Sequence, residues 1–191
     1  MDFAAHFVRA LIALFAACGM MLGAAHAQCA DPFQVAAQTG TSAFVQTRHL
    51  TGVRTPLVSR GQAVVAPGRV EWRVTNPIDI RTVITPTGIT QSVENGPPQS
   101  LGPQGADPFA SGAGLFDLLV GDFAAVRTHY DIARLAPAAN GSWRLRLTPR
   151  GAGLARFVSQ IEVNGCSAIE GVEVRQANGD RMEIALTRED G

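Results

Sequence analysis

The chain of 191 residues contains no lysine: its sixteen basic residues are all arginines, and sixteen acidic residues balance them to a formal net charge of zero. This balance excludes the strongly basic surface of nucleic-acid-binding proteins and a polybasic membrane tether. The two histidines beyond residue 27, His49 and His129, lack the ligand spacing typical of zinc sites and are expected on strand faces. No Gly-x-Ser-x-Gly motif occurs. The sequence therefore predicts neither an enzyme nor a bound metal or other cofactor.

Only one apolar run approaches the length of a membrane span, and it covers residues 10–25. A spanning helix needs about 20 apolar residues, and this run is shorter and ends at the small-x-small cleavage motif Ala25-His26-Ala27. We therefore expect a cleaved signal peptide over residues 1–27 and a single soluble domain over residues 28–191 in the periplasm. The alternative, a lipobox that ends at an acylated Cys18, is disfavoured because its first position is Phe15.

Cysteine is rare, with three in the chain, and cleavage after residue 27 leaves Cys29 and Cys166 as an even pair. An oxidising compartment favours a disulfide between two such residues. In the chain-entropy model a loop of this length constrains the unfolded chain by roughly 4 to 5 kcal/mol. Two unpaired thiols are the alternative.

Turn signals and alternating patterns predict a sheet of about ten antiparallel strands. Asn140-Gly141, Asn164-Gly165 and Asn178-Gly179 are typical of type I′ hairpin turns. Val70, Trp72 and Val74 alternate with charged residues, as do Trp143, Leu145 and Leu147, so each of these strands has one apolar face. Ten strands are too many for a flat sheet in so small a domain, and the sheet must curl or split. The predicted strands cover residues 42–49, 57–65, 69–75, 79–85, 88–94, 128–135, 142–148, 156–163, 168–175 and 181–187.

Two segments have helical signals. Asp31-Pro32 is a typical helix start, and residues 33–38 are compatible with a short helix. The apolar run Leu115–Val120 follows the glycine- and proline-rich segment 96–114 and predicts a short helix carried on loops.

The order of several short motifs resembles the LolA family of periplasmic carriers of outer-membrane lipoproteins. The resemblance covers most of residues 33–188 and rests on Phe44-Val45-Gln46, Gly61-Gln62, Pro67, Trp72, Pro77, Gly88, the run Leu115–Val120, Leu147-Thr148-Pro149-Arg150 and Phe157. It implies an incomplete, curved antiparallel β-barrel whose open side is covered by short helices. It also implies a carrier that shields the acyl chains of a lipoprotein or other lipid-like cargo between an inner-membrane donor and an outer-membrane acceptor.

The resemblance selects apolar positions for the cavity and its lid. They are Val70, Trp72, Val74, Ile89, Leu115, Phe116, Leu118, Leu119, Trp143, Leu145 and Phe157. The alternative is that these residues form ordinary core, since an apolar sheet face more often packs against protein than against a ligand.

One position departs from the family pattern. In the turn between the second and third strands, family members have an arginine directly before the proline, whereas this chain has Ala66-Pro67. Arg69 is the candidate for a substitute polar gate. The departure leaves open a cargo other than a lipoprotein. A lipid-sensing regulatory module on the same fold remains the alternative function, followed by an enzyme without a recognisable motif or a structural accessory.

Overall fold

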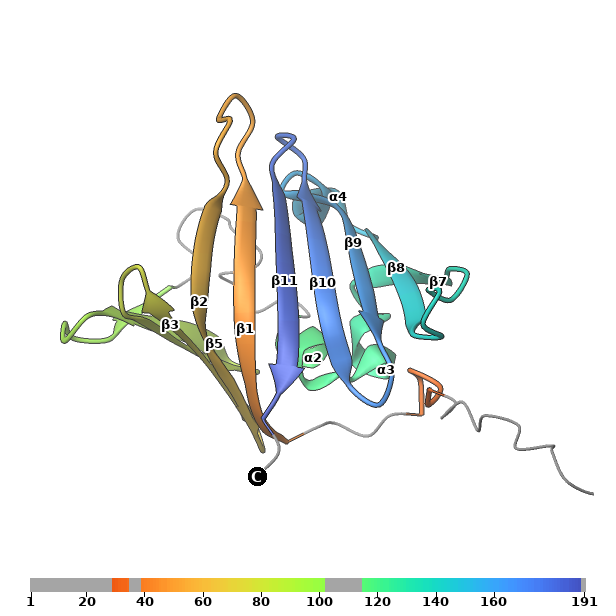
Figure 1. Cartoon of the computed structure of the whole chain (residues 1–191), viewed down its shortest axis with the longest axis horizontal. Helices are drawn as coiled ribbons and strands as arrows, with labels where there is room; N and C mark the ends of the chain where they lie inside the picture. Colours follow the sequence, from red (N-terminus) through yellow and green to blue (C-terminus); the bar gives the residue numbers. More distant parts are fainter. Residues whose placement is uncertain (1–28, 35–38, 102–114, 190–191) are drawn as a thin grey trace, which may run out of the picture.

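The computed structural model describes residues 29–34, 39–101 and 115–189 (Figure 1). The expected signal peptide and most of segment 96–114 lie outside these residues. In the described part of the chain, eleven antiparallel strands form one curved, unclosed sheet, which confirms the predicted fold class. The strands are β1 (Gly40–His49), β2 (Leu57–Ala66), β3 (Arg69–Asn76), β4 (Ile80–Thr85), β5 (Gly88–Val93), β6 (Gln99–Ser100), β7 (Tyr130–Arg134), β8 (Trp143–Pro149), β9 (Val158–Gly165), β10 (Ile169–Gln176) and β11 (Arg181–Arg188).

Two meanders make up the sheet, and they join in its middle. The strand order is β6-β5-β4-β3-β2-β1-β11-β10-β9-β8-β7, so that the first long strand pairs with the last. In this junction Ser42 lies opposite Arg188 and His49 lies opposite Arg181. The one strand that the sequence did not predict is β6, which adds two residues to the edge beside β5.

Among the described residues, three short helices accompany the sheet: α2 (Leu115–Val120), α3 (Phe123–Val126) and α4 (Ala152–Ala155). In Figure 1, α2 and α3 lie behind β10 and β11, on the concave side of the sheet. The described residues contain no helix long and apolar enough to cross a membrane.

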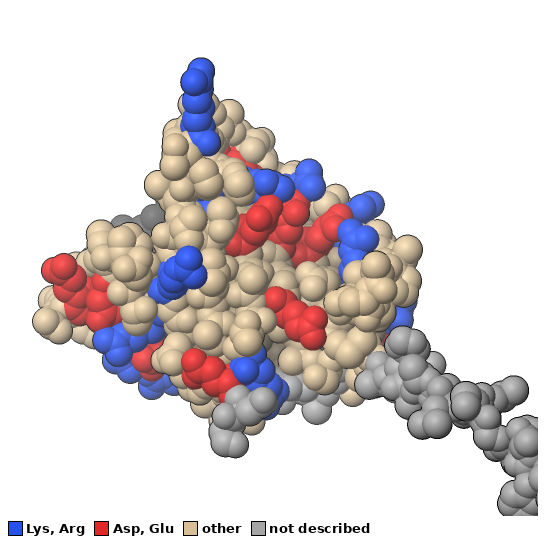
Figure 2. Space-filling model, viewed as in Figure 1, with Lys and Arg blue, Asp and Glu red and all other residues tan. Residues whose placement is uncertain are grey.

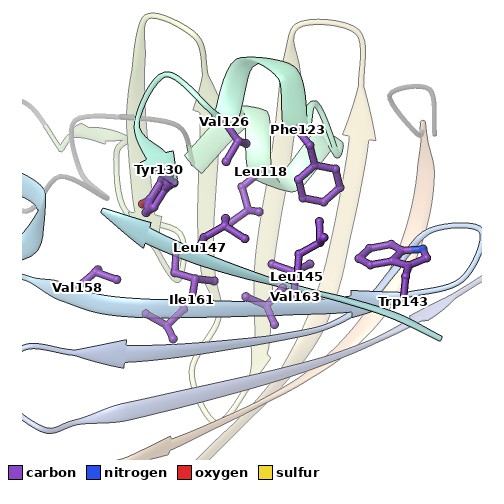
Figure 3. Packing of buried hydrophobic residues seen from close by; sticks show 12 residues of the cluster. Leu118, Phe123, Val126, Tyr130, Trp143, Leu145, Leu147, Val158, Ile161 and Val163 are labelled. Carbon is purple, nitrogen blue, oxygen red and sulfur yellow. The ribbon is translucent and has the colours of Figure 1, made fainter. Parts of the chain in front are cut away.

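The predicted alternation separates the two faces of the sheet. Leu145 and Leu147 on β8 are fully buried on the concave side, within a cluster that also contains Tyr130 (Figure 3). Burial raises the pKa of Tyr130 to about 12. On the outer face, the β8 arginines form ion pairs with a glutamate of β9 (Figure 2). The sheet therefore keeps its apolar side chains under the helices and its charges in water.

The Asn-Gly pairs do not form the predicted type I′ turns, because such turns need positive φ at both central residues. At residues 140–141 and 178–179 only the glycine has positive φ, at 85° and 91°. Each pair instead ends a three-residue loop in which the glycine N–H donates to the carbonyl three residues earlier. Three-residue loops combine a type I turn with a glycine in the left-handed region, and both sites match that form.

The third pair, Asn164-Gly165, forms the last two residues of β9 and precedes the turn. Gly165 serves packing there, since a Cβ atom would lie 1.9 Å from the Ala168 carbonyl oxygen and 2.8 Å from Trp143. The helix expected after Asp31 was also wrong over its first residues. Residues 32–34 form a turn in which Phe33 N donates to Asp31 Oδ1 at 2.9 Å, and residues 35–38 lie outside the described residues.

Candidate functional site

A small apolar cavity of about 70 Å³ lies between the concave face of the sheet and the two helices α2 and α3. Strands from both meanders contribute to it, because β1 and β11 meet behind it. Its sheet side contains Ala63, Val65, Val70, Trp72, Trp143, Ala168, Ile169, Val172 and Leu186, and its helix side contains Leu118, Leu119, Val120, Gly121 and Phe123. Thr39, Gly40, Thr41, Ser42 and Arg188 complete the wall.

Trp72 lines the cavity from β3 and is held by a stacked aromatic contact. Its ring centroid lies 3.9 Å from that of Phe44 on β1, with 22° between the planes. The intervening strand passes close to this pair at Gly61, where a Cβ atom would lie 1.9 Å from the Arg73 carbonyl oxygen and 2.8 Å from Phe44. Glycine is therefore required at residue 61 for the stack to form.

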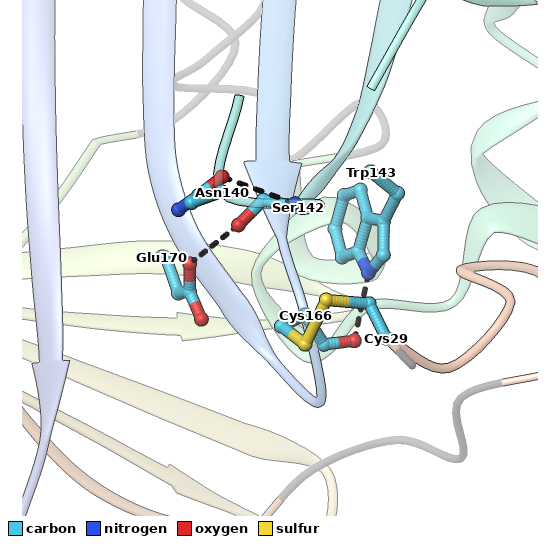
Figure 4. The surroundings of a disulfide bond; sticks show 6 residues. All are labelled: Cys29, Asn140, Ser142, Trp143, Cys166 and Glu170. Atoms are coloured by element: carbon cyan, nitrogen blue, oxygen red, sulfur yellow. Dashed lines mark hydrogen bonds between the residues drawn. A yellow bond between two sulfur atoms is a disulfide. The ribbon is translucent and has the colours of Figure 1, made fainter. Parts of the chain in front are cut away.

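Trp143 lines the opposite side of the cavity from β8. Its indole Nε1 donates to the Cys166 carbonyl oxygen at 2.9 Å, which satisfies the only polar atom of a buried ring (Figure 4). Phe123 of α3 meets the indole edge to face, with ring centroids 6.0 Å apart. This aromatic contact joins the β8 side of the cavity to α3.

The disulfide between Cys29 and Cys166 lies next to this indole (Figure 4). It agrees with the bond expected from the cysteine count, and it holds residues 29–34 beside the helices. From that segment Phe33 makes a second edge-to-face contact with Phe123, at 6.1 Å between ring centroids. The disulfide therefore supports α3 through one intermediate side chain.

Helices α2 and α3 form the lid segment, residues 115–126. Each is far shorter than the 12 to 15 residues or so at which an isolated helix becomes marginally stable in water. Asp122 caps α3, since its Oδ1 accepts from Ala125 N at 3.0 Å, and Gly121 turns the chain between the helices with φ of 78°. Within the described part of the chain, no backbone hydrogen bond joins the lid segment to a strand. Among the described residues, side-chain packing holds the lid segment against the sheet.

Two buried clusters receive the lid segment. Leu118, Phe123 and Val126 pack into the larger cluster, with strands β7 to β10. Val120 packs into a smaller cluster with strands β3 to β5. The lid segment therefore connects the two halves of the sheet across its concave face.

The carboxyl group of Asp117, in the lid segment, has a raised pKa. Burial, and then the neighbouring carboxylate of Asp122, raise the pKa of Asp117 above its ordinary value of 3.8, and His129 opposes the shift. The ionised form of Asp117 is thus less favourable in the folded protein than in water.

The predicted site residues divide into three groups. Val70, Trp72, Leu118, Leu119 and Trp143 line the cavity. Four others belong to the buried clusters or pack against them: Ile89 and Phe116 on the β3–β5 side, and Leu145 and Phe157 on the β7–β10 side.

Two of the remaining three, Val74 and Arg69, are not among the residues that line the cavity. Val74 is half-buried further along β3, and Leu115 begins α2 but its side chain is outside the described part of the structure. Arg69 is exposed at the first position of β3, where its Nη2 lies 2.7 Å from Glu71 Oε2. Hydrogen bonds from Arg81 and then from Arg69 hold the pKa of Glu71 below its usual range. The gate role of Arg69 stays a prediction.

Sequence reasoning missed several wall residues. Phe123 was missed because the helix that carries it is too short to give a pattern in the sequence. The signal that could have identified it is an aromatic residue just after the apolar run Leu115–Val120. Arg188 was missed because it follows the apolar part of β11, yet its alternation with Leu186 places both on the cavity side. Among the described residues that line the cavity, Arg188 alone carries a formal charge, and its Nη2 donates to the Thr39 carbonyl at 3.0 Å.

No group of three or more histidine, cysteine, aspartate or glutamate side chains in the described residues could hold a metal ion. No protein-family model and no curated protein matches the chain.

Several solved structures are similar to this chain at low identity, and three of them are named here. A LolA superfamily protein from Nitrosomonas europaea is 9% identical, with a TM-score of 0.43, over 84% of this chain and 91% of that one. A domain from Vibrio parahaemolyticus, described as an outer membrane lipoprotein-sorting protein, is 12% identical, with a TM-score of 0.39, over 80% and 86%. A DUF1329 family protein from Desulfovibrio piger is 8% identical, with a TM-score of 0.35, over 81% and 88%.

Proposed function

We propose that this protein is a periplasmic carrier that takes the acyl chain of a lipoprotein or other lipid-like cargo between the concave sheet face and the lid segment. The observation that carries the proposal is the apolar cavity between Trp72, Trp143 and the lid segment. An inner-membrane donor and an outer-membrane acceptor would be its partners. The predicted lining residues enter this proposal as the wall against which the acyl chain packs.

The cavity has to enlarge before an acyl chain can enter. An apolar cavity of about 150 Å³ holds one benzene molecule, and the space here is about half of that. The lid segment is the element that can move, because it shares no backbone hydrogen bond with a strand in the described part of the chain. Its displacement would open the concave face and leave the sheet intact.

The energies of lid opening and cargo binding are of similar size. Exposing Leu118, Phe123 and Val126 costs about 1.5 to 3 kcal/mol for each side chain, or about 5 to 9 kcal/mol together. Each buried methylene contributes about 0.8 kcal/mol, so about 6 to 11 methylenes offset the cost of opening. Binding should therefore rise steeply with acyl length, and chains much shorter than this should not bind.

The two tryptophans of the chain provide a direct test, since both line the cavity. A fatty acid brominated in mid-chain quenches tryptophan fluorescence only at close contact. We expect brominated palmitate to quench the protein strongly, while brominated octanoate has little effect at the same concentration. Trp72→Phe and Trp143→Phe should each retain quenching through the remaining indole. Equal fluorescence with brominated and plain palmitate would count against the proposal.

A pair of adjacent residues on β2 supplies the matched control. Val65 lines the cavity, whereas Val64 is exposed on the opposite face of the same strand. Val65→Asp places a carboxylate in the cavity and should abolish quenching by brominated palmitate. Val64→Asp introduces the same charge one residue away and should leave quenching unchanged. Loss of quenching in both variants would point to a general effect of charge on β2.

Transfer distinguishes a carrier from a lipid sensor. The loaded protein should move a fluorescent acylated peptide from inner-membrane vesicles to outer-membrane vesicles. Binding without transfer, together with a protein partner that is recognised only by the loaded form, would favour the regulatory module.

A further inference from the structure

The hairpin between β1 and β2 projects beyond the neighbouring turns of the sheet (Figure 1). Its loop contacts the β10–β11 turn through Thr51, whose N donates to Asp180 Oδ1 at 2.8 Å and whose Oγ1 donates to the Asn178 carbonyl at 3.4 Å. We call residues 52–58 the hairpin tip. In the described part of the chain no side chain of the hairpin tip forms a hydrogen bond or an ion pair, so the tip is free to contact another surface.

Three large apolar side chains are exposed on the hairpin tip. Val53 and Leu57 are 52% and 53% exposed, and Val58 is 44% exposed. Leu57 and Val58 are successive residues of β2 and therefore point to opposite faces of the hairpin, with Val53 at its turn. The end of the hairpin is thus apolar on more than one side, which suits insertion into a surface better than docking into a one-sided groove.

The hairpin also has charge of one sign. No acidic residue occurs between Asp31 and Glu71, whereas Arg54 and Arg60 lie in this hairpin. Neither arginine forms an ion pair among the residues that the structure describes, in contrast to Arg144, which pairs with Glu162 at 3.0 Å. Figure 2 shows arginine atoms at the projecting end. An anionic surface is the complement of this charge.

The spacing of apolar and basic groups matches a lipid interface. Arg60 follows Leu57 by three residues, or about 10 Å along an extended strand. Interfacial protein segments bury their apolar side chains about 5 to 10 Å into the boundary between headgroups and acyl chains. With Leu57 and Val58 at that depth, the guanidinium of Arg60 lies level with lipid phosphates.

We propose that the hairpin tip docks this protein onto an anionic lipid surface. Val53, Leu57 and Val58 enter the interface, and Arg54 and Arg60 contact phosphate groups. This surface is separate from the cavity, and its action does not depend on what the cavity holds.

Flotation of the full chain with vesicles tests the proposal. We expect the protein to float with vesicles of equal parts phosphatidylglycerol and phosphatidylcholine, and to remain behind with phosphatidylcholine alone. Arg54→Gln and Arg60→Gln should each lower the partition coefficient about fivefold, as expected for one basic side chain near an anionic surface. Added salt should weaken binding by screening. Failure of the wild-type protein to float with the anionic vesicles would overturn the proposal.

Matched variants separate the hairpin tip from general effects. Leu57→Ser should reduce flotation, whereas Ile78→Ser should not, although Ile78 is 50% exposed and lies outside the hairpin. Arg150→Gln changes the net charge as Arg54→Gln does, and it should leave flotation unchanged because Arg150 pairs with Asp131. Equal losses in a variant and its control would refute a role for the hairpin tip.

Two further measurements test whether the hairpin tip contacts lipid or a second copy of the chain, and whether it acts independently of the cavity. Sedimentation velocity should give a monomer for wild type and for Leu57→Ser, and a dimer that Leu57→Ser disrupts would assign the tip to a second copy instead of lipid. Quenching by brominated palmitate should be unchanged in Arg54→Gln and Leu57→Ser. A loss of quenching in these variants would contradict the separation of the hairpin tip from the cavity.

Discussion

Removing the disulfide by the double substitution Cys29→Ala and Cys166→Ala should cost a large share of the folding stability. The bond closes a loop with a sequence separation of 137 residues. In the chain-entropy model a loop of that length constrains the unfolded chain by about 5 kcal/mol at 25 °C, which is also the upper end of values for removing native disulfides. The free energy of unfolding of most single-domain proteins is only about 5 to 15 kcal/mol in total.

Urea denaturation followed by circular dichroism measures this loss. With a slope of about 2 kcal/mol per molar urea, the midpoint should fall by about 2.5 M. Wild-type protein under a thiol reductant should match the double variant, because both lack the same constraint. Phe33→Ala with the disulfide intact is the control, since it removes the contact with Phe123 but keeps the loop closed. A loss below about 1 kcal/mol in the double variant would refute the loop-closure argument.

Three further predictions concern the lid segment and the indole beside it. Asp117→Asn should raise the free energy of unfolding at pH 7, because the pKa of Asp117 is raised in the folded protein and its ionised form is unfavourable there. This penalty disappears as the carboxyl is protonated, so the variant and the wild type should have the same stability below pH 3.8. Urea melts at several pH values measure the difference. Leu119→Asp should abolish palmitate binding while far-ultraviolet circular dichroism stays that of the folded sheet, and unfolding of the variant would instead assign Leu119 to the essential core. Gly165→Ala should destabilise the protein by about 1 to 3 kcal/mol through overpacking against Trp143, and the emission of that indole should change in the folded state.

Local patterns in the sequence predicted most strands and their faces. The alternation of Trp143, Leu145 and Leu147 with arginines was sufficient for β8, because a strand with one buried face has a period of two. The same rule applies to Arg69: it neighbours Val70 and so belongs to the outer face, where it meets Glu71. Its assignment as a gate came from the resemblance and not from this pattern.

Features that depend on contacts between residues distant in the chain could not be predicted from the sequence. The sequence of Asn164-Gly165 resembles that of the other two Asn-Gly pairs, and only the positions of Ala168 and Trp143 show that this glycine is needed for close packing at the end of a strand. The size of the cavity likewise depends on how Leu118 and Phe123 pack against both meanders. Arg188 joined the cavity wall only because β11 pairs with β1.

The pairing of β1 with β11 also has a consequence for the order of folding. The central strand of the sheet, β1, is the first of the described strands to leave the ribosome, and its neighbour β11 is the last of them. Neither meander can gain its inner partner until the chain has been made to residue 188, and contacts of such long range form slowly. The sheet therefore stays in two unjoined halves until this last of the described strands has been made.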